Sequence, residues 1–192
     1  MGSLDENLLI QKSQAGDIKS FEMLIETYQK KAFNIAYRML GNLEDANDVT
    51  QEAFVKVYKS LGKFKGDSKF STWLYSIVTN ASIDYMRKNR KTDVVYLDKK
   101  EEDKMKIEVP DNINTPEHLF EKKEIKRVIH DSINKLSKEH RTVIILRDIQ
   151  GFSYDEIANI LNCSEGTVKS RISRARGQLK NILSQNVAST TC

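Results

Sequence analysis

The chain has 192 residues and a formal net charge of +4, with 39% apolar and 30% charged residues. This length accommodates one large or two small domains, and only two Pro and eight Gly argue against an all-β sandwich, which needs a turn signal every ~8–12 residues. Because no apolar run approaches the ~18 residues of a membrane span and no signal peptide opens the chain, we expect a cytoplasmic protein without membrane insertion.

Four helices are predicted in the first half of the chain. Between residues 18 and 40, apolar residues recur at three- and four-residue steps, which is the helical period. Gly41 and Asn42 then end one helix and offer a cap to the next. The predicted helices span residues 5–15, 18–40, 43–61 and 69–90, and a loop at 62–68 precedes the last of them.

Two of these helices have outward faces of interest. The helix at 43–61 turns outward a polar stripe that contains one apolar residue, which hints at a protein partner. The stripe comprises Asp48, Gln51, Glu52, Val55 and Lys59. The helix at 69–90 presents hydroxyls, an amide and cations beside the aromatic residues Trp73 and Tyr75, a combination suited to stacked bases and phosphates. This second face comprises Thr72, Ser76, Thr79, Asn80, Ile83, Arg87 and Arg90.

The middle of the chain separates two basic ends. Residues 92–114 lose all helical periodicity and are rich in charged side chains, so we interpret them as a flexible acidic linker. Residues 1–91 carry a net charge of +3 and residues 117–192 a net charge of +4. We therefore predict an all-α fold with two small helical domains, 1–91 and 115–192, whose ends both meet a polyanion.

The second domain contains a predicted helix-turn-helix. Its helices are expected near 117–135, 138–149, 153–161 and 165–183, with Pro116 at the start of the first. Ser153 and Glu156 form a Ser-x-x-Glu capping box, and Ser164 caps the helix after a tight turn. Such a helical pair with a short turn is typical of DNA-binding proteins.

The last helix separates an apolar stripe from a polar and cationic face. Val168, Ile172, Ala175 and Leu179 fall on one side of a helical wheel. Small polar side chains and one arginine on the opposite side suit base edges, and the cations beside them suit phosphates. The predicted DNA-binding residues are Gly166, Thr167, Lys169, Ser170, Arg171, Ser173, Arg174 and Arg176.

Neither a metal site nor a cofactor is predicted. Cys163 and Cys192 lack the spacing of zinc ligands and are expected to be reduced thiols. His118, His130 and His140 are scattered without ligand spacing.

Five sequence motifs stand out in chain order: DANDVTQEAF at 45–54, FSTWLYSIVTNASIDYMR at 70–87, LSKEHRTVIIL at 136–146, GFSYDEIA at 151–158 and GTVKSRISRAR at 166–176. In this order they resemble the extracytoplasmic-function (ECF, group IV) sigma factors of bacterial RNA polymerase. The resemblance covers nearly the whole chain except 92–114 and the last ten residues.

The resemblance implies a transcription initiation factor with no enzymatic activity. The N-terminal domain would bind core polymerase and open the minus-ten promoter element, and the C-terminal domain would read the minus-thirty-five element. An anti-sigma factor is an expected regulator, and the stress response an expected context. Asp48, Gln51, Glu52 and Val55 would face polymerase. The minus-ten residues would be Phe64, Lys65, Asp67, Ser68, Thr72, Ser76, Asn80, Ile83 and Arg87.

Two other functions remain open from the sequence. A free-standing helix-turn-helix regulator is usually dimeric and binds half-sites about one helical turn apart. A metal-dependent nucleic-acid enzyme would have to use acids such as Asp48, Glu52 and Asp84, which lack histidine or glycine-rich companions. Dimer mass with palindromic footprints would favour the first of these, and metal-dependent DNA cleavage the second.

Overall fold

A computed structural model describes residues 3–89 and 116–190, and the described residues contain helices but no strand. The helices are α1 (Ser3–Gln14), α2 (Ile18–Leu40), α3 (Leu43–Ser60), α4 (Phe70–Lys88), α5 (Pro116–Asn134), α6 (Lys138–Ile144), α7 (Tyr154–Leu161) and α8 (Glu165–Thr190). A short 3-10 turn, η1, spans Leu61–Lys63, and a π-helical turn, η3, spans Ile145–Ile149. The all-α prediction is confirmed, whereas the predicted linker at 92–114 lies outside the described residues.

Local signals define the helix ends in the N-terminal half. Gly41 adopts a left-handed conformation (φ 77°) and its N–H donates to the carbonyl of Tyr37, which ends α2. The Asn42 side chain then accepts hydrogen bonds from the N–H groups of Glu44 and Asp45 at the start of α3. The sequence-based boundaries therefore hold to within a few residues here.

The C-terminal half departs from the prediction in two places. The helix expected at 138–149 consists of α6 followed by the π turn η3. The last helix continues to Thr190 rather than ending near residue 183. The capping box at the start of α7 is present, with Ser153 Oγ accepting from the N–H of Glu156 and Glu156 accepting from the N–H of Ser153.

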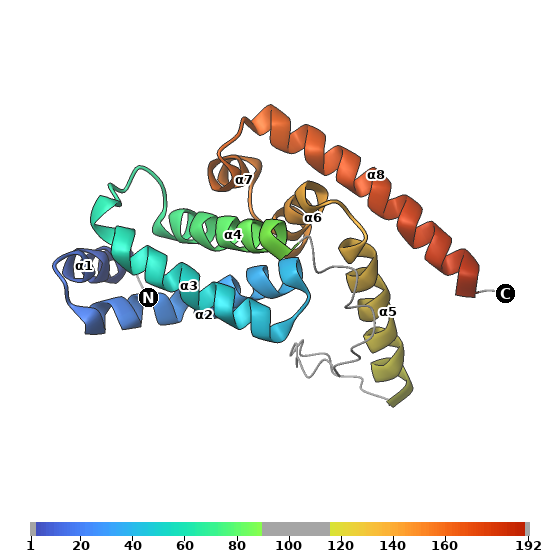
Figure 1. Cartoon of the computed structure of the whole chain (residues 1–192), viewed down its shortest axis with the longest axis horizontal. Helices are drawn as coiled ribbons and strands as arrows, with labels where there is room; N and C mark the ends of the chain where they lie inside the picture. Colours follow the sequence, from blue (N-terminus) through green and yellow to red (C-terminus); the bar gives the residue numbers. More distant parts are fainter. Residues whose placement is uncertain (1–2, 90–115, 191–192) are drawn as a thin grey trace.

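The two halves of the chain pack against each other. Figure 1 shows α6 and α7 beside α4, and α8 extending along the outer side of the molecule. The buried apolar residues of both halves form one continuous cluster, which includes Tyr75 of α4 and Phe152 before α7. We call the surface where α6, η3 and α7 meet α2 and α4 the junction.

Cations from both halves bridge the junction. Lys31 donates to the carbonyl of Gln150 (3.3 Å) and lies over the ring of Phe152, 4.1 Å from its centroid. The Phe152 ring in turn meets the edge of Tyr75 at 5.5 Å between centroids. Arg141 donates to the carbonyl of Met39 (3.1 Å), and Lys138 donates to the carbonyl of Met86. Desolvation lowers the pKa of Lys31.

Candidate nucleic-acid interface

The helix-turn-helix comprises α7, a short turn and α8. Asn162 takes a left-handed conformation (φ 49°) at the end of α7, which lets the chain reverse within three residues. Ser164 Oγ accepts a hydrogen bond from the N–H of Thr167 (3.2 Å) and caps α8. The predicted inner stripe is confirmed, because Val168, Ile172 and Ala175 are buried.

The predicted recognition face of α8 lies mostly at the surface. Thr167 and Arg171 are half-buried, and the exposed members of the set are Gly166, Lys169, Ser170, Ser173, Arg174 and Arg176. Within the part of the chain that the structure describes, Arg174 has no hydrogen bond or ion pair. Its guanidinium is therefore available for a base edge or a phosphate.

Two other cations of this face already have protein partners. Lys169 pairs with Glu165 (2.7 Å), which raises the pKa of Lys169, and it also lies 5.6 Å from the Tyr154 ring centroid. Arg176 donates through two nitrogens to the two carboxylate oxygens of Asp148 in η3. Because this bidentate pair joins two elements, Arg176 holds α8 against η3.

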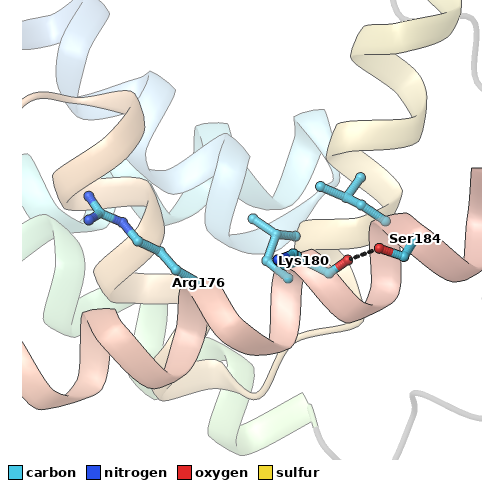
Figure 2. Close-up of a pocket in the computed structure, with 5 residues that line it drawn as sticks. Arg176, Lys180 and Ser184 are labelled. Carbon is cyan, nitrogen blue, oxygen red and sulfur yellow. Dashed lines mark hydrogen bonds between the residues drawn. The ribbon is translucent and has the colours of Figure 1, made fainter.

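A shallow hollow lies farther along α8. Figure 2 shows Arg176 at one end and Ser184 at the other, with the Ser184 hydroxyl donating to the carbonyl of Lys180 (2.9 Å). Leu179 and Leu183 supply its apolar lining. The hollow begins where the predicted recognition residues end, so it is separate from the face that carries Arg174.

In the N-terminal half, part of the predicted minus-ten face of α4 is covered. Thr72 and Thr79 were expected at the surface, but Thr72 is only 4% exposed and Thr79 is fully buried. These expectations are wrong because α4 packs against α7 as well as against α2 and α3. Asn80 and Arg87 are exposed, whereas Ser76 and Ile83 are half-buried.

Asn80 lies in a cationic groove between α3 and α4. The groove has a volume of about 510 Å³ and includes Asp84 on the α4 side. Three lysines line its other side: Lys56 and Lys59 from α3, and Lys63 from η1. Sequence reasoning placed Lys63 in the loop before the DNA-binding helix but did not assign Lys56 and Lys59 to DNA, although their spacing of three residues places them on one face of α3. The groove offers cations for a phosphate backbone beside an amide for a base.

The loop before α4 is fixed at its base and open at its tip. Phe64 is half-buried and packs against Trp73 and Phe70, with centroids 5.1 and 5.5 Å away. Lys65 and Asp67 are exposed at the tip, and Ser68 is half-buried. Phe64 is thus an anchor of the loop, and Trp73 contributes to the same aromatic cluster.

The predicted polymerase-binding face of α3 is exposed. Asp48, Gln51 and Glu52 lie at the surface, and Val55 is 51% exposed. Tyr58, one turn beyond, is also exposed and meets the edge of Phe21 at 4.9 Å. A hydrogen bond from Lys56 (2.8 Å) lowers the pKa of the Glu52 carboxyl. Val55 and Tyr58 therefore form an apolar spot within a polar stripe.

Among the described residues, no cluster of three or more His, Cys, Asp or Glu side chains could hold a metal ion. None of the helices described is long and apolar enough to cross a membrane.

Comparisons with known proteins agree with this architecture. Residues 24–92 match Sigma-70 region 2, and residues 126–179 match Sigma-70, region 4. The ECF RNA polymerase sigma-E factor of Haemophilus influenzae is 36% identical, and the alignment covers 93% of this chain and 95% of that protein. The RNA polymerase sigma-H factor of Pseudomonas aeruginosa is 37% identical, with 91% and 92% coverage.

A solved structure extends the likeness to three dimensions. The sigma factor RpoE of Bartonella quintana, in complex with the anti-sigma factor NepR, is similar with a TM-score of 0.66 and 26% identity. The similarity covers 87% of this chain and 98% of that one. Together with the two matched regions and the relatives that span nearly the full length, this shows that the chain belongs to the ECF sigma factors of RNA polymerase.

Proposed function

We propose that this sigma factor reads the minus-thirty-five element with α8 and captures the opened minus-ten strand with α4 and the loop at 64–68. The observation that carries the proposal is the presence of two separate cationic surfaces: the recognition face with the unpaired Arg174, and the lysine-lined groove that holds Asn80. Duplex recognition requires the first kind of surface, and single-strand capture the second.

The proposed contacts divide by chemistry. On α8, Gly166, Ser170, Ser173 and Arg174 face the base edges, with Lys169 and Arg171 near phosphates. In the groove, lysines follow the strand while Asn80 reads an unstacked base. Capturing a base offsets an unpairing cost of a few kcal/mol, and each stacked base returns about 1–3 kcal/mol.

The two surfaces have to separate in order to act together. The minus-ten and minus-thirty-five elements lie about 25 base pairs apart, which is about 85 Å of duplex. In the structure, α7, which directly precedes the recognition helix, packs on α4, which carries Asn80. We infer that polymerase binding parts the two halves, so the free chain should bind promoter DNA weakly.

The composition of the junction favours reversible packing. Thr79 is fully buried, and its hydroxyl has no hydrogen-bond partner among the residues described. An unsatisfied buried hydroxyl costs about 1–3 kcal/mol, and exposure to water or DNA removes this cost. The junction thus contains a polar group whose hydrogen bond is made only when α4 is uncovered.

The exposed face of α3 is the proposed polymerase-binding surface. Val55 and Tyr58 form its apolar spot, and the polar residues of the same face are Asp48, Gln51 and Glu52. Since RpoE of Bartonella quintana was solved with an anti-sigma factor, we propose that a protein of that class also regulates this chain. The chain would act in the cytoplasm with polymerase and perform no catalytic step itself.

Run-off transcription with bacterial core polymerase on a promoter library tests the proposal. Adding the chain should produce promoter-specific transcripts, and Arg174→Ala should reduce them about 5- to 150-fold if the arginine contacts a base. Asn80→Ala should reduce them as well. Lys180→Ala, an exposed cation of α8 beyond the recognition face, is the matched control and should retain near wild-type output.

Other outcomes would contradict the proposal. Polymerase-independent, palindromic footprints from a dimer would identify a free-standing regulator instead. An equal loss of transcripts in Lys180→Ala and Arg174→Ala would show that the general positive charge of α8, rather than the recognition face, is responsible for the activity.

A further inference from the structure

We propose that Gln14, the last residue of α1, is a positioning residue for minus-ten recognition. Its amide nitrogen donates to the carbonyl of Leu61 (3.0 Å) and to the carbonyl of Phe64 (3.0 Å). These acceptors lie 47 and 50 residues away in the chain, at the start of the loop that is proposed to capture the strand. The inference rests on that proposed function.

The geometry uses the whole donor capacity of the side chain. A glutamine amide nitrogen carries two N–H groups, which is enough to donate one to each of the two carbonyls within reach. The Leu61 carbonyl also accepts from the N–H of Phe64 (3.0 Å), so Gln14 completes a small hydrogen-bonded ring at the base of the loop. With the Phe64 ring packed on Trp73 and Phe70, this fixes where the loop leaves the fold.

The end of α1 holds Gln14 in place. Gly16 takes a left-handed conformation (φ 96°), and its N–H donates to the carbonyl of Ser13 (3.0 Å). The N–H of Asp17 donates to the carbonyl of Lys12 (3.0 Å), and the Asp17 side chain then caps α2. Because both sides of this corner are capped, Gln14 is presented from a rigid support rather than from a loose end.

Helix α1 itself is docked on the core. Leu9 and Ile10 are buried, and Tyr28 of α2 donates a hydrogen bond to Glu6. The match to Sigma-70 region 2 begins only at residue 24, so α1 lies outside it. The structure thus assigns a part in promoter reading to a helix outside the matched region.

The tip of the loop is exposed, so its position depends on how the base of the loop is held. Lys65, Gly66 and Asp67 are exposed, and Gly66 has φ 82°, a left-handed conformation that glycine adopts without steric cost. A change in the direction of the chain at Phe64 therefore shifts the tip residues, which are the ones proposed to face the strand. Base selection should depend on Gln14 more strongly than folding does.

The test compares Gln14→Glu with Gln11→Glu in run-off transcription by full chain and core polymerase on a promoter library randomised in the minus-ten element. Glutamate has nearly the same shape, but its carboxylate donates nothing and faces two carbonyl oxygens. Gln11 is exposed on the same helix, and its substitution introduces the same charge. Gln14→Ala is a second variant, which removes the donors without adding charge.

Gln14→Glu should lower the preference for the best base at one or two adjacent minus-ten positions by about three- to tenfold, the effect of losing one or two hydrogen bonds. Minus-thirty-five preferences, the Tm and the affinity for core polymerase should match those of Gln11→Glu. Gln14→Ala should show the same position-specific loss, to a smaller extent.

Three results would overturn the inference. Equal base preferences in Gln14→Glu and Gln11→Glu would show that the hydrogen bonds do not position the loop. A uniform loss across all minus-ten bases would indicate a purely structural role. No minus-ten preference in the wild-type chain would refute the proposed function and the inference together, and the wild-type profile alone distinguishes that case.

Discussion

Arg174 and Arg176 lie two residues apart on α8, yet their surroundings differ. Arg174 is exposed and has no partner among the described residues, whereas the guanidinium of Arg176 makes a bidentate ion pair with Asp148. The sequence placed both in the DNA-binding set, because a helical wheel shows the direction of a side chain and not its partner. We now expect base contact from Arg174 and orientation of α8 from Arg176.

This division predicts that Asp148→Ala and Arg176→Ala have the same phenotype. Each should lower stability by about 1 kcal/mol or less, since the pair is partly exposed. Chemical denaturation in a double-mutant cycle should show a coupling of that size, and run-off transcription should fall equally in both single variants. Increased transcription by Asp148→Ala, with decreased transcription by Arg176→Ala, would instead identify Arg176 as a direct DNA contact.

At the scale of the element, α4 packs against α6 and α7 of the C-terminal half in addition to α2 and α3. Phe70, Leu74, Val78 and Ala81 face the N-terminal core, as the helical period predicts. A second stripe is buried as well, comprising Thr72, Tyr75, Thr79, Ser82 and Met86, and its members Tyr75 and Met86 contact the C-terminal half. The exposed strip that remains is narrow and is centred on Asn80 and Arg87.

Because Tyr75 lies in this buried stripe, we predict that the stability of the fold depends on pH through its phenol group. Desolvation raises the pKa of the Tyr75 phenol to about 12, above its ordinary value of 10.0. The folded state holds the phenol proton more tightly than the unfolded state does. The contribution of Tyr75 to the free energy of unfolding is therefore fully present below pH 10 and is lost as the pH rises towards 12. The loss has a slope of up to about 1.4 kcal/mol per pH unit.

Denaturant unfolding between pH 9.5 and 12 measures this effect. The free energy of unfolding should fall less steeply in Tyr75→Phe than in the wild type. Tyr58→Phe, which removes an exposed hydroxyl, is the control and should follow the wild-type slope. Identical slopes in all three proteins would show that Tyr75 does not remain protonated in the folded state above pH 10.

At the scale of the whole molecule, the junction sets the spacing of the two DNA-reading surfaces. Its bridging groups are a cation over an aromatic ring and cations on backbone carbonyls, and they lie beside an apolar cluster that both halves share. Packing of this kind can hold the free chain closed and still yield to a larger partner that binds both halves.

Phe152→Ala tests this arrangement, because it removes both the ring beneath Lys31 and the contact with Tyr75. The radius of gyration of the free chain should increase in X-ray scattering, and its affinity for a minus-ten single strand should rise. Phe33→Ala, which changes a half-buried aromatic residue of α2, is a control for general loosening of the N-terminal half. An unchanged radius with unchanged affinity would show that Phe152 does not hold the halves together.

The helices, the helix-turn-helix and the family could all be predicted from the amino-acid sequence. These follow from local patterns: an apolar period, Gly41 and Asn42 at a boundary, and the reciprocal cap of Ser153 and Glu156 all act within a few residues. The exposed polar face around Arg174 was predictable for the same reason, because one helix fixes both its inner and its outer side.

The packing of the helices determines which predicted surface residues are covered and which cations are already paired. Thr72 and Thr79 are buried, Arg176 is bound by Asp148, and Lys56 joins Asn80 in one groove across two helices. Gln14 meets a loop 47 residues away. Such contacts depend on how helices that are far apart in the sequence pack together. The helical period shows which side of a helix is apolar, but it does not show which other element packs against it.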